Sequence, residues 1–77
     1  MAKVTIYTTP TCTYCRMAKS YFKDHGIEYS EYDVSEEQDR AEEMLEKSGQ
    51  MGVPVIDIGG KIIVGFDRRA ISEALGI

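Results

Sequence analysis

The sequence predicts an α/β fold in the order strand, helix, strand, helix, strand, strand, helix, with a four-stranded mixed sheet flanked by three helices. Three observations predict it. Short segments rich in β-branched residues alternate with stretches whose apolar residues recur at helical spacing. A Gly59-Gly60 pair separates the last two strand-like segments. The 77 residues, 43% of them hydrophobic, are enough for one core, so we expect residues 1–77 to form one domain.

The first half of the chain predicts a strand-helix-strand unit. Residues 3–8 alternate polar and apolar side chains, and the Thr-Thr-Pro-Thr segment at 8–11 ends this strand. Apolar and aromatic residues recur at helical spacing over residues 12–25, and Gly26 is placed to end the helix. Residues 28–34 predict a second strand. Such a unit implies two parallel strands joined by a right-handed crossover.

A second helix is predicted after residue 34. Ser35, followed three residues later by Gln38, matches a capping box, and Gly49 is placed at the end. The side chains expected on its inner face are Ala41, Met44, Leu45 and Ser48.

The last part predicts a hairpin and a helix. Residues 53–58 and 61–64 flank the two glycines, which reach positive φ angles without steric cost. Asp67 is a good cap for a final helix. The apolar stripe of that helix consists of Ala70, Ile71, Ala74 and Leu75.

The charge pattern limits the classes of partner. The formal net charge is −4, and residues 24–46 alone carry ten acidic residues and one arginine. A nucleic-acid partner is therefore not expected. We interpret the acidic helix over 36–46 as a solvated face, with docking of a basic protein as the alternative. No apolar stretch approaches the roughly 20 residues of a membrane span. Met1-Ala2-Lys3 leads directly into the first strand without a signal peptide, so we expect a cytoplasmic protein.

Cys12 and Cys15 are the two cysteines of the chain, and their spacing places both in the first turn of the first predicted helix. A disulfide between them would close too short a loop to stabilise the fold much, which favours a bond that is made and broken. The start of a helix makes a nearby thiol more acidic. We therefore predict that Cys12 attacks and that Cys15 resolves the mixed disulfide. Thr11 is the predicted cap, and Arg16 and Lys19 add positive charge.

A structural zinc site is the alternative interpretation of the two cysteines. Zinc requires four ligands, and the chain has no second cysteine pair and one histidine, His25, at the other end of the same helix. A Cys-x-x-Cys motif that follows a strand in this pattern favours redox chemistry. We therefore expect no metal site.

Three segments at matching separations carry a resemblance to a known family. They are residues 11–15 (Thr-Cys-Thr-Tyr-Cys), 52–54 (Gly-Val-Pro) and 65–67 (Gly-Phe-Asp). Together they resemble the glutaredoxin family of thioredoxin-fold proteins over essentially the full length.

The resemblance implies a set of site residues. It implies that Pro54 follows a cis peptide bond and lies against the cysteines. The backbone of Val53 would pair with glutathione or an extended substrate peptide, and Asp67 with its helix start would hold the γ-glutamyl end. The catalytic residues would be Cys12 and Cys15. The expected substrate-binding residues are Thr11, Thr13, Tyr14, Val53, Pro54, Gly65, Phe66 and Asp67.

Departures from the family pattern leave the reductant open. Many glutathione-using members have a lysine where Thr9 stands, a threonine where Gly52 stands and an aspartate where Arg68 stands. Gly65-Phe66 is similar to the glutaredoxin-like electron donors of ribonucleotide reductase, which thioredoxin reductase reduces.

Thr13 is a further departure, because proline is frequent at its position in the family. The absence of that proline is common among relatives that share a [2Fe–2S] cluster across a dimer.

The predicted function is that of a dithiol thiol-disulfide oxidoreductase that reduces protein or glutathione mixed disulfides. The alternatives are an iron–sulfur carrier and a thioredoxin-reductase-dependent donor to ribonucleotide reductase. No tightly bound cofactor is expected. The expected partners are glutathione or a flavoprotein of the thioredoxin-reductase type, together with disulfide-containing proteins, and the chain is expected to be a monomer.

Overall fold

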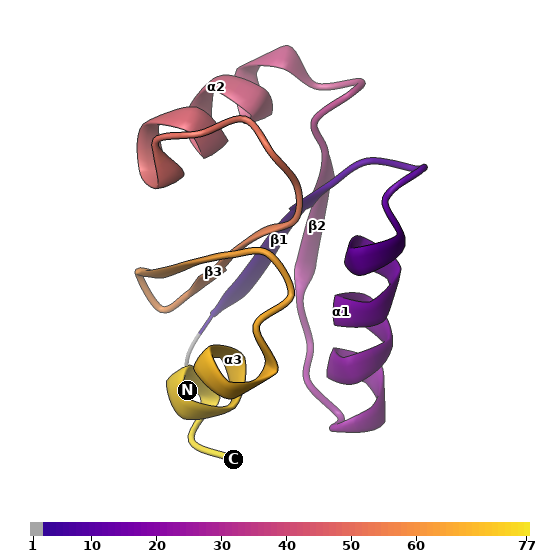
Figure 1. Ribbon diagram of the computed structural model, residues 1–77, viewed down its shortest axis with the longest axis vertical. Coiled ribbons are helices and arrows are strands. Elements are labelled where there is room, and N and C mark those ends of the chain that lie inside the picture. Colours follow the sequence, from indigo (N-terminus) through magenta and orange to yellow (C-terminus); the bar gives the residue numbers. More distant parts are fainter. Residues whose placement is uncertain (1–2) are drawn as a thin grey trace.

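The computed structural model, which describes residues 3–77, has its helices and strands in the order that the sequence predicts (Figure 1). The elements are β1 (Val4–Thr8), α1 (Thr13–Asp24), β2 (Ser30–Asp33), α2 (Gln38–Ser48), β3 (Val55–Ile58), β4 (Lys61–Val64) and α3 (Arg68–Leu75). Met1-Ala2, on which the expectation about a signal peptide rests, lies outside the described residues. Among the helices of residues 3–77, none combines the length and the apolar character that crossing a membrane requires.

The strands form one mixed sheet in the order β2-β1-β3-β4, which confirms the predicted fold class. β1 pairs with β2 in parallel and with β3 antiparallel, and β3 pairs with β4 antiparallel. Tyr7 near the end of β1 lies opposite Val55 at the start of β3, which in turn lies opposite Val64 at the end of β4. One edge of the sheet therefore collects the segments that follow β1, precede β3 and follow β4.

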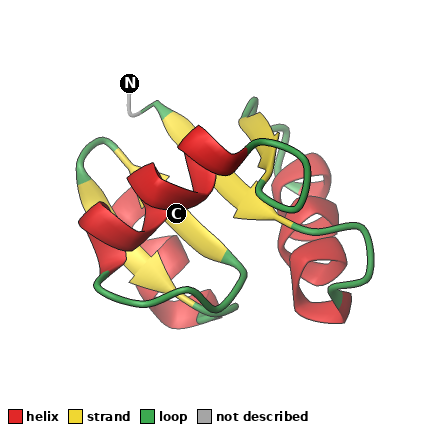
Figure 2. Cartoon of the chain, turned by 90° about the horizontal axis from the view of Figure 1, so that it is seen from above, coloured by secondary structure: helices red, strands yellow, loops and turns green. Residues whose placement is uncertain are grey.

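Side chains point alternately to the two faces of the sheet along each strand, and the helices pack on both faces. Val4 and Ile6 of β1 belong to a core cluster with residues of α1 and α3, whereas Tyr7 packs with Met44 of α2. Seen from above, the strands lie between the helices (Figure 2). All five residues of β1 are buried, because this central strand is covered on both faces.

The hairpin and the last helix form as predicted. Gly59 and Gly60 adopt φ angles of 58° and 96°, the positive values that a two-residue turn between strands requires. Asp67 Oδ1 accepts the backbone N–H of Ala70 at 3.2 Å and so caps α3. Ile71 is fully buried, in agreement with the predicted apolar stripe.

The predicted capping box before α2 is wrong. Asp33 Oδ1 accepts the backbone N–H of Ser35 at 2.9 Å and its hydroxyl at 2.5 Å, so the serine side chain is used in a turn. The helix begins at Gln38, with Glu37 at its cap. Leu45, expected on the inner face, is 43% exposed, because Met44 takes the inward position against the sheet.

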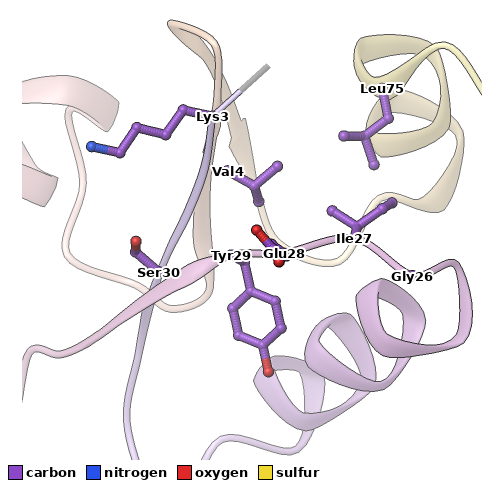
Figure 3. Close-up of a pocket in the computed structure, with 8 residues that line it drawn as sticks. All are labelled: Lys3, Val4, Gly26, Ile27, Glu28, Tyr29, Ser30 and Leu75. Carbon is purple, nitrogen blue, oxygen red and sulfur yellow. The ribbon is translucent and has the colours of Figure 1, made fainter. Parts of the chain in front are cut away.

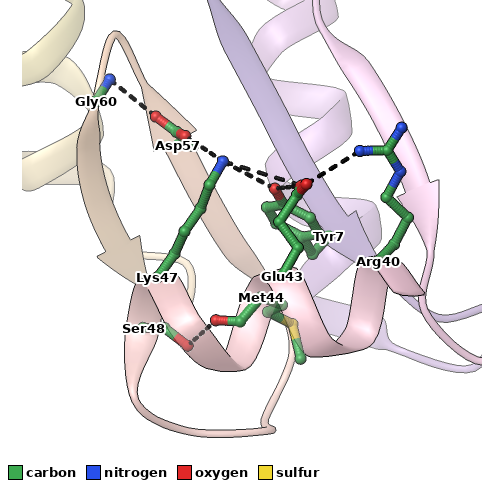
Figure 4. A network of polar contacts seen from close by, with 8 residues as sticks. All are labelled: Tyr7, Arg40, Glu43, Met44, Lys47, Ser48, Asp57 and Gly60. Atoms are coloured by element: carbon green, nitrogen blue, oxygen red, sulfur yellow. Dashed lines mark hydrogen bonds and ion pairs between the residues drawn. The ribbon is translucent and has the colours of Figure 1, made fainter. Parts of the chain in front are cut away.

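A polar network ties α2 to the sheet (Figure 4). The Tyr7 hydroxyl donates a short hydrogen bond to Glu43 and accepts one from Lys47 Nζ at 3.0 Å. Lys47 Nζ also donates to Asp57 Oδ2 of β3 at 2.8 Å, and Arg40 pairs with Glu43 at 3.1 Å. Side chains of α2 thereby contact both central strands through polar groups as well as through Met44.

The network shifts the pKa values of its carboxyl groups. Burial opposes ionisation of Asp57, but hydrogen bonds from Lys47 and from the Gly60 N–H outweigh it and lower the pKa. The hydrogen bond from Tyr7 lowers the pKa of Glu43. A carboxyl group with a lowered pKa contributes stability that is complete above the ordinary carboxyl pKa of about 4 and is lost as the pH falls through the folded-state value.

We expect Lys47→Met to lower the free energy of unfolding by about 1 kcal/mol at pH 7, because two acceptors lose their donor. The difference from the wild type should shrink as the pH falls from about 5 to about 3. Urea unfolding at both pH values measures it, and Lys61→Met, which removes an exposed lysine of β4, is the matched control. Equal losses for the two variants would contradict a role for the network.

Candidate active site

The two cysteines lie at the start of α1 and are both reduced. Cys12 is the helix cap: its backbone is extended, and its Sγ accepts the backbone N–H of Cys15 at 3.1 Å. The prediction that Thr11 caps the helix is therefore wrong. The Cys12 N–H donates to the Thr9 carbonyl at 3.3 Å, so the chain turns at residues 10–11 and the helix starts one residue later than a Thr11 cap would allow.

The environments of the two thiols differ. Cys12 is partly exposed, whereas Cys15 is fully buried. Burial, followed by the hydrogen bond with Cys12, raises the pKa of the Cys15 thiol to about 11. At neutral pH Cys15 is a protonated thiol beneath the surface, and Cys12 is the sulfur that an incoming disulfide can reach.

Thr8 is a site residue that the sequence analysis missed. Thr8 is 2% exposed, and its hydroxyl donates to the Thr9 carbonyl at 3.3 Å. Its side chain lowers the pKa of the Cys15 thiol against the stronger effect of burial. The backbone of Thr9 also lowers the pKa of the Cys15 thiol. Alternation along β1 places Thr8 on the α1 face with Val4 and Ile6, so its position at the end of a buried strand just before the motif was the available signal.

Val53 and Pro54 reach the same edge of the sheet from β3. The Val53–Pro54 peptide bond is cis, as the family resemblance implies. Tyr7 pairs with Val55, and continuing this register by one residue places Pro54 opposite Thr8. Pro54 is fully buried, and the half-buried Val53 packs on the cluster of Tyr7, Met44 and Val55.

Gly65, Phe66 and Asp67 follow β4 at this edge. The Gly65 N–H donates to the Pro54 carbonyl at 2.8 Å, and the φ of Gly65 is 81°. The Phe66 ring packs partly buried on the core, and Asp67 caps α3. The register and this hydrogen bond thus bring residues 53–54 and 65–67 together at the sheet edge where the loop to Cys12 starts.

The surface beside Cys12 is formed by the other predicted residues. Thr11 and Thr13 are exposed on either side of it, and the Tyr14 side chain is 62% exposed. An exposed aromatic ring next to the reactive sulfur offers apolar contact area to a protein or peptide.

Gln50 is a second residue that the sequence analysis missed. Its side-chain amide donates to the Gly52 carbonyl at 2.9 Å and accepts the Gly52 N–H at 2.9 Å. A Cβ atom at position 52 would lie 2.7 Å from Gln50 Oε1. The loop before Val53 is therefore held by Gln50, in an arrangement in which a threonine at position 52 would displace that side chain.

Four acidic residues, Asp39, Glu42, Glu43 and Glu46, lie on α2. α2 covers the sheet face opposite α1, and Lys19 near the cysteines is paired with Glu31 at 2.8 Å. Glu43 belongs to the Tyr7 network, so Asp39, Glu42 and Glu46 are the exposed acidic residues that a basic partner would meet on α2. Within residues 3–77, no three side chains of the His, Cys, Asp and Glu types gather closely enough to hold a metal ion.

A cavity of about 730 Å³ lies at the opposite end of the fold (Figure 3). Its lining includes Lys3 and Val4 at the start of β1, Tyr29 before β2 and Leu75 of α3. Because Cys12 follows the other end of β1, this cavity is not part of the candidate active site.

Comparison with known proteins places these features in a family. The glutaredoxin family model matches residues 4–63. The chain is 42% identical to a glutaredoxin-like 8.6 kDa protein in the rubredoxin operon of Clostridium pasteurianum, over 94% of this chain and 96% of that protein. It is 37% identical to glutaredoxin 3 of Escherichia coli strain K12, over 99% of this chain and 92% of that protein. The solved structure of the glutaredoxin-like protein NrdH-redoxin from Escherichia coli matches with a TM-score of 0.83 at 27% identity, covering 92% of each chain.

We expect brief treatment of the reduced protein with iodoacetamide at pH 7 to modify Cys12 and spare Cys15. Cys15 is buried, and a pKa of about 11 leaves roughly one Cys15 in ten thousand as thiolate at this pH. Mass spectrometry should find one adduct, on residue 12, and none in the Cys12→Ser variant. Labelling of Cys15 as fast as Cys12 would contradict the difference between the two thiols.

Proposed function

The chain belongs to the glutaredoxin family, and from this premise we propose that it is a dithiol thiol-disulfide oxidoreductase that reduces protein disulfides and glutathione mixed disulfides. One observation carries the proposal: a partly exposed cysteine caps α1 while a buried, protonated cysteine lies one turn further along. A reducing compartment such as the cytoplasm suits this chemistry.

The first step is attack by the Cys12 thiolate on one sulfur of the substrate disulfide. A bond forms between Cys12 Sγ and that sulfur, the substrate S–S bond breaks, and the released thiolate takes up a proton. The backbone N–H of Cys15 donates to Cys12 Sγ at 3.1 Å and stabilises its negative charge before the attack.

The second step is resolution by Cys15. Two influences of Cys12 raise the pKa of Cys15 in the reduced protein, namely a hydrogen bond and its charge, and both end when Cys12 enters the mixed disulfide. The contributions of Thr8 and Thr9 remain and favour the Cys15 thiolate. That thiolate attacks Cys12 Sγ, so a Cys12–Cys15 bond forms and the bond between Cys12 and the substrate sulfur breaks. The released substrate thiolate takes up the proton that Cys15 lost, and two electrons have passed from the protein to the substrate.

Substrate binding is assigned to the segments that surround Cys12. In this proposal the Val53 backbone pairs with an extended substrate, and Tyr14 and Phe66 supply apolar contacts. The start of α3 at Asp67 receives a carboxylate, which agrees with the partial positive charge of a helix N-terminus. Thr11, Thr13 and Gly65 complete the surface, and the fully buried Pro54 holds the backbone next to Val53.

We propose a flavoprotein of the thioredoxin-reductase type as the alternative reductant to glutathione. Gln50 occupies the space where a threonine at position 52 would sit, and Arg68 lies over the Tyr21 ring at 5.7 Å. Both positions carry glutathione contacts in many family members. NrdH-redoxin from Escherichia coli, whose solved structure resembles this chain, is a glutaredoxin-like protein with a thioredoxin-like activity profile.

The Cys12→Ser variant should lose disulfide reduction by at least about 1,000-fold, since no other exposed thiol is present to attack. Cys15→Ser should keep activity only on glutathione mixed disulfides, where a second glutathione can resolve the intermediate. NADPH oxidation in a coupled assay measures both variants. Turnover by Cys12→Ser at the wild-type rate would overturn the proposed function.

The physiological type of reductant is tested by supplying NADPH with either thioredoxin reductase or glutathione plus glutathione reductase. If the arrangement at Gly52 and Arg68 weakens glutathione binding, thioredoxin reductase should give the higher kcat/KM. The Arg68→Asp variant, with the family's frequent residue, should then shift turnover toward glutathione. Turnover of the wild-type protein with glutathione and glutathione reductase, and none with thioredoxin reductase, would overturn the proposal of the alternative reductant.

A further inference from the structure

We propose that Tyr21 is a positioning residue that holds the substrate-binding segment after β4 against the helix that carries the cysteines. Tyr21 lies on α1, between one and two turns after Cys15, and its side chain is 9% exposed. This inference rests on the proposed function, because it assigns a role to Tyr21 in binding the same substrates.

The hydroxyl of Tyr21 makes a contact between the two helices. It lies 2.6 Å from Ser72 Oγ of α3, a distance typical of a hydrogen bond between hydroxyl groups. The bond is partly buried and joins residues 51 positions apart in the chain. It is therefore a tertiary link between α1 and α3 rather than a local contact.

The ring of Tyr21 contacts the segment that leads into α3. Its centroid lies 6.1 Å from that of Phe66 in an edge-to-face arrangement, and the Arg68 guanidinium carbon lies 5.7 Å from the ring centre. Such contacts contribute beyond simple burial of area. One side chain of α1 thus contacts Phe66, Arg68 and Ser72, which flank Asp67 at the proposed substrate-binding position.

Besides Tyr21, the fully buried Ile71 holds α3 in the core cluster that also contains Ala18 and Phe22 of α1. The Gly65 N–H bonds to the Pro54 carbonyl, and this attaches the segment to β3. α3 has eight residues, a length at which an isolated helix is not stable and tertiary contacts determine its position. Tyr21 supplies the side-chain hydrogen bond to α3 from the α1 side and contacts Phe66 and Arg68, the residues on either side of Asp67.

The reactive sulfurs depend on a different set of contacts. The Cys12 Sγ accepts a hydrogen bond from the Cys15 N–H within the first turn of α1. Thr8 and Thr9 lower the pKa of the Cys15 thiol. Removing the Tyr21 hydroxyl leaves these contacts in place. The variant should therefore change substrate affinity and not the chemical step.

The test uses Tyr21→Phe, Ser72→Ala and the double variant of the full chain. With a glutathionylated peptide as substrate, each single variant should raise KM by about 2- to 10-fold, the range expected for one hydrogen bond. The double variant should raise it no further, because both changes remove the same bond. kcat and the rate of Cys12 alkylation should stay within about twofold of the wild type.

Tyr29→Phe is the matched control. Tyr29 packs on Phe22 of α1, and within residues 3–77 its hydroxyl makes no hydrogen bond to α3. It should leave KM unchanged. Amide hydrogen exchange gives a readout that does not depend on activity: residues 66–71 should exchange faster in Tyr21→Phe and not in Tyr29→Phe.

Three results would overturn the proposal: additive effects in the double variant, a fall in kcat with unchanged KM, or unchanged exchange at residues 66–71. An inactive wild-type protein would instead overturn the proposed function, and with it the expected KM effect.

Discussion

The burial of β1 on both faces is the constraint on which the rest of the structure depends. Its side chains alternate between the α1–α3 core and the α2 core, so Ile6 packs on one face and Tyr7 on the other. The strand also pairs on both edges, with β2 and β3. Because its register is set on both faces and both edges, the residue at its end is accurately placed. That residue is Thr8, whose side chain lowers the pKa of Cys15 and which leads through a short turn to Cys12.

From that edge of the sheet the site is assembled by backbone contacts more than by side chains. The antiparallel register places Pro54 level with Thr8, and the Gly65 N–H to Pro54 carbonyl bond carries the alignment on to the segment after β4. Gln50 holds the loop before Val53 by bonding both backbone groups of Gly52. Backbone hydrogen bonds of this kind depend little on which side chains surround them, which is why a family pattern of a few residues can identify the whole site.

The two cysteines have different environments, because the first turn of α1 leads from the surface into the core. Cys12 lies at the cap, where its Sγ accepts the backbone N–H of Cys15 and remains partly exposed. Three residues later, Cys15 faces the sheet and loses water, so burial holds it as a thiol. A disulfide between residues three positions apart closes too short a loop to stabilise the fold much. The same spacing leaves one sulfur partly exposed and the other buried, close enough to form a bond with each other. A hydrogen bond between the hydroxyl groups of Tyr21 and Ser72 also joins α1 to α3.

Hydrophobic periodicity and turn residues determined the element order, the glycine hairpin and the Asp67 cap, because these follow from contacts between residues near in sequence. The errors arose where a residue had two local choices. Ser35 matched a capping box but bonds to Asp33 in a turn, and Thr11 matched a cap that Cys12 provides. Gln50 and Tyr21 had no distinguishing pattern in the sequence, since their contacts with Gly52 and Ser72 form only on folding. Tertiary structure alone decided which thiol is buried and which segments surround it, because burial and register depend on how distant strands pack.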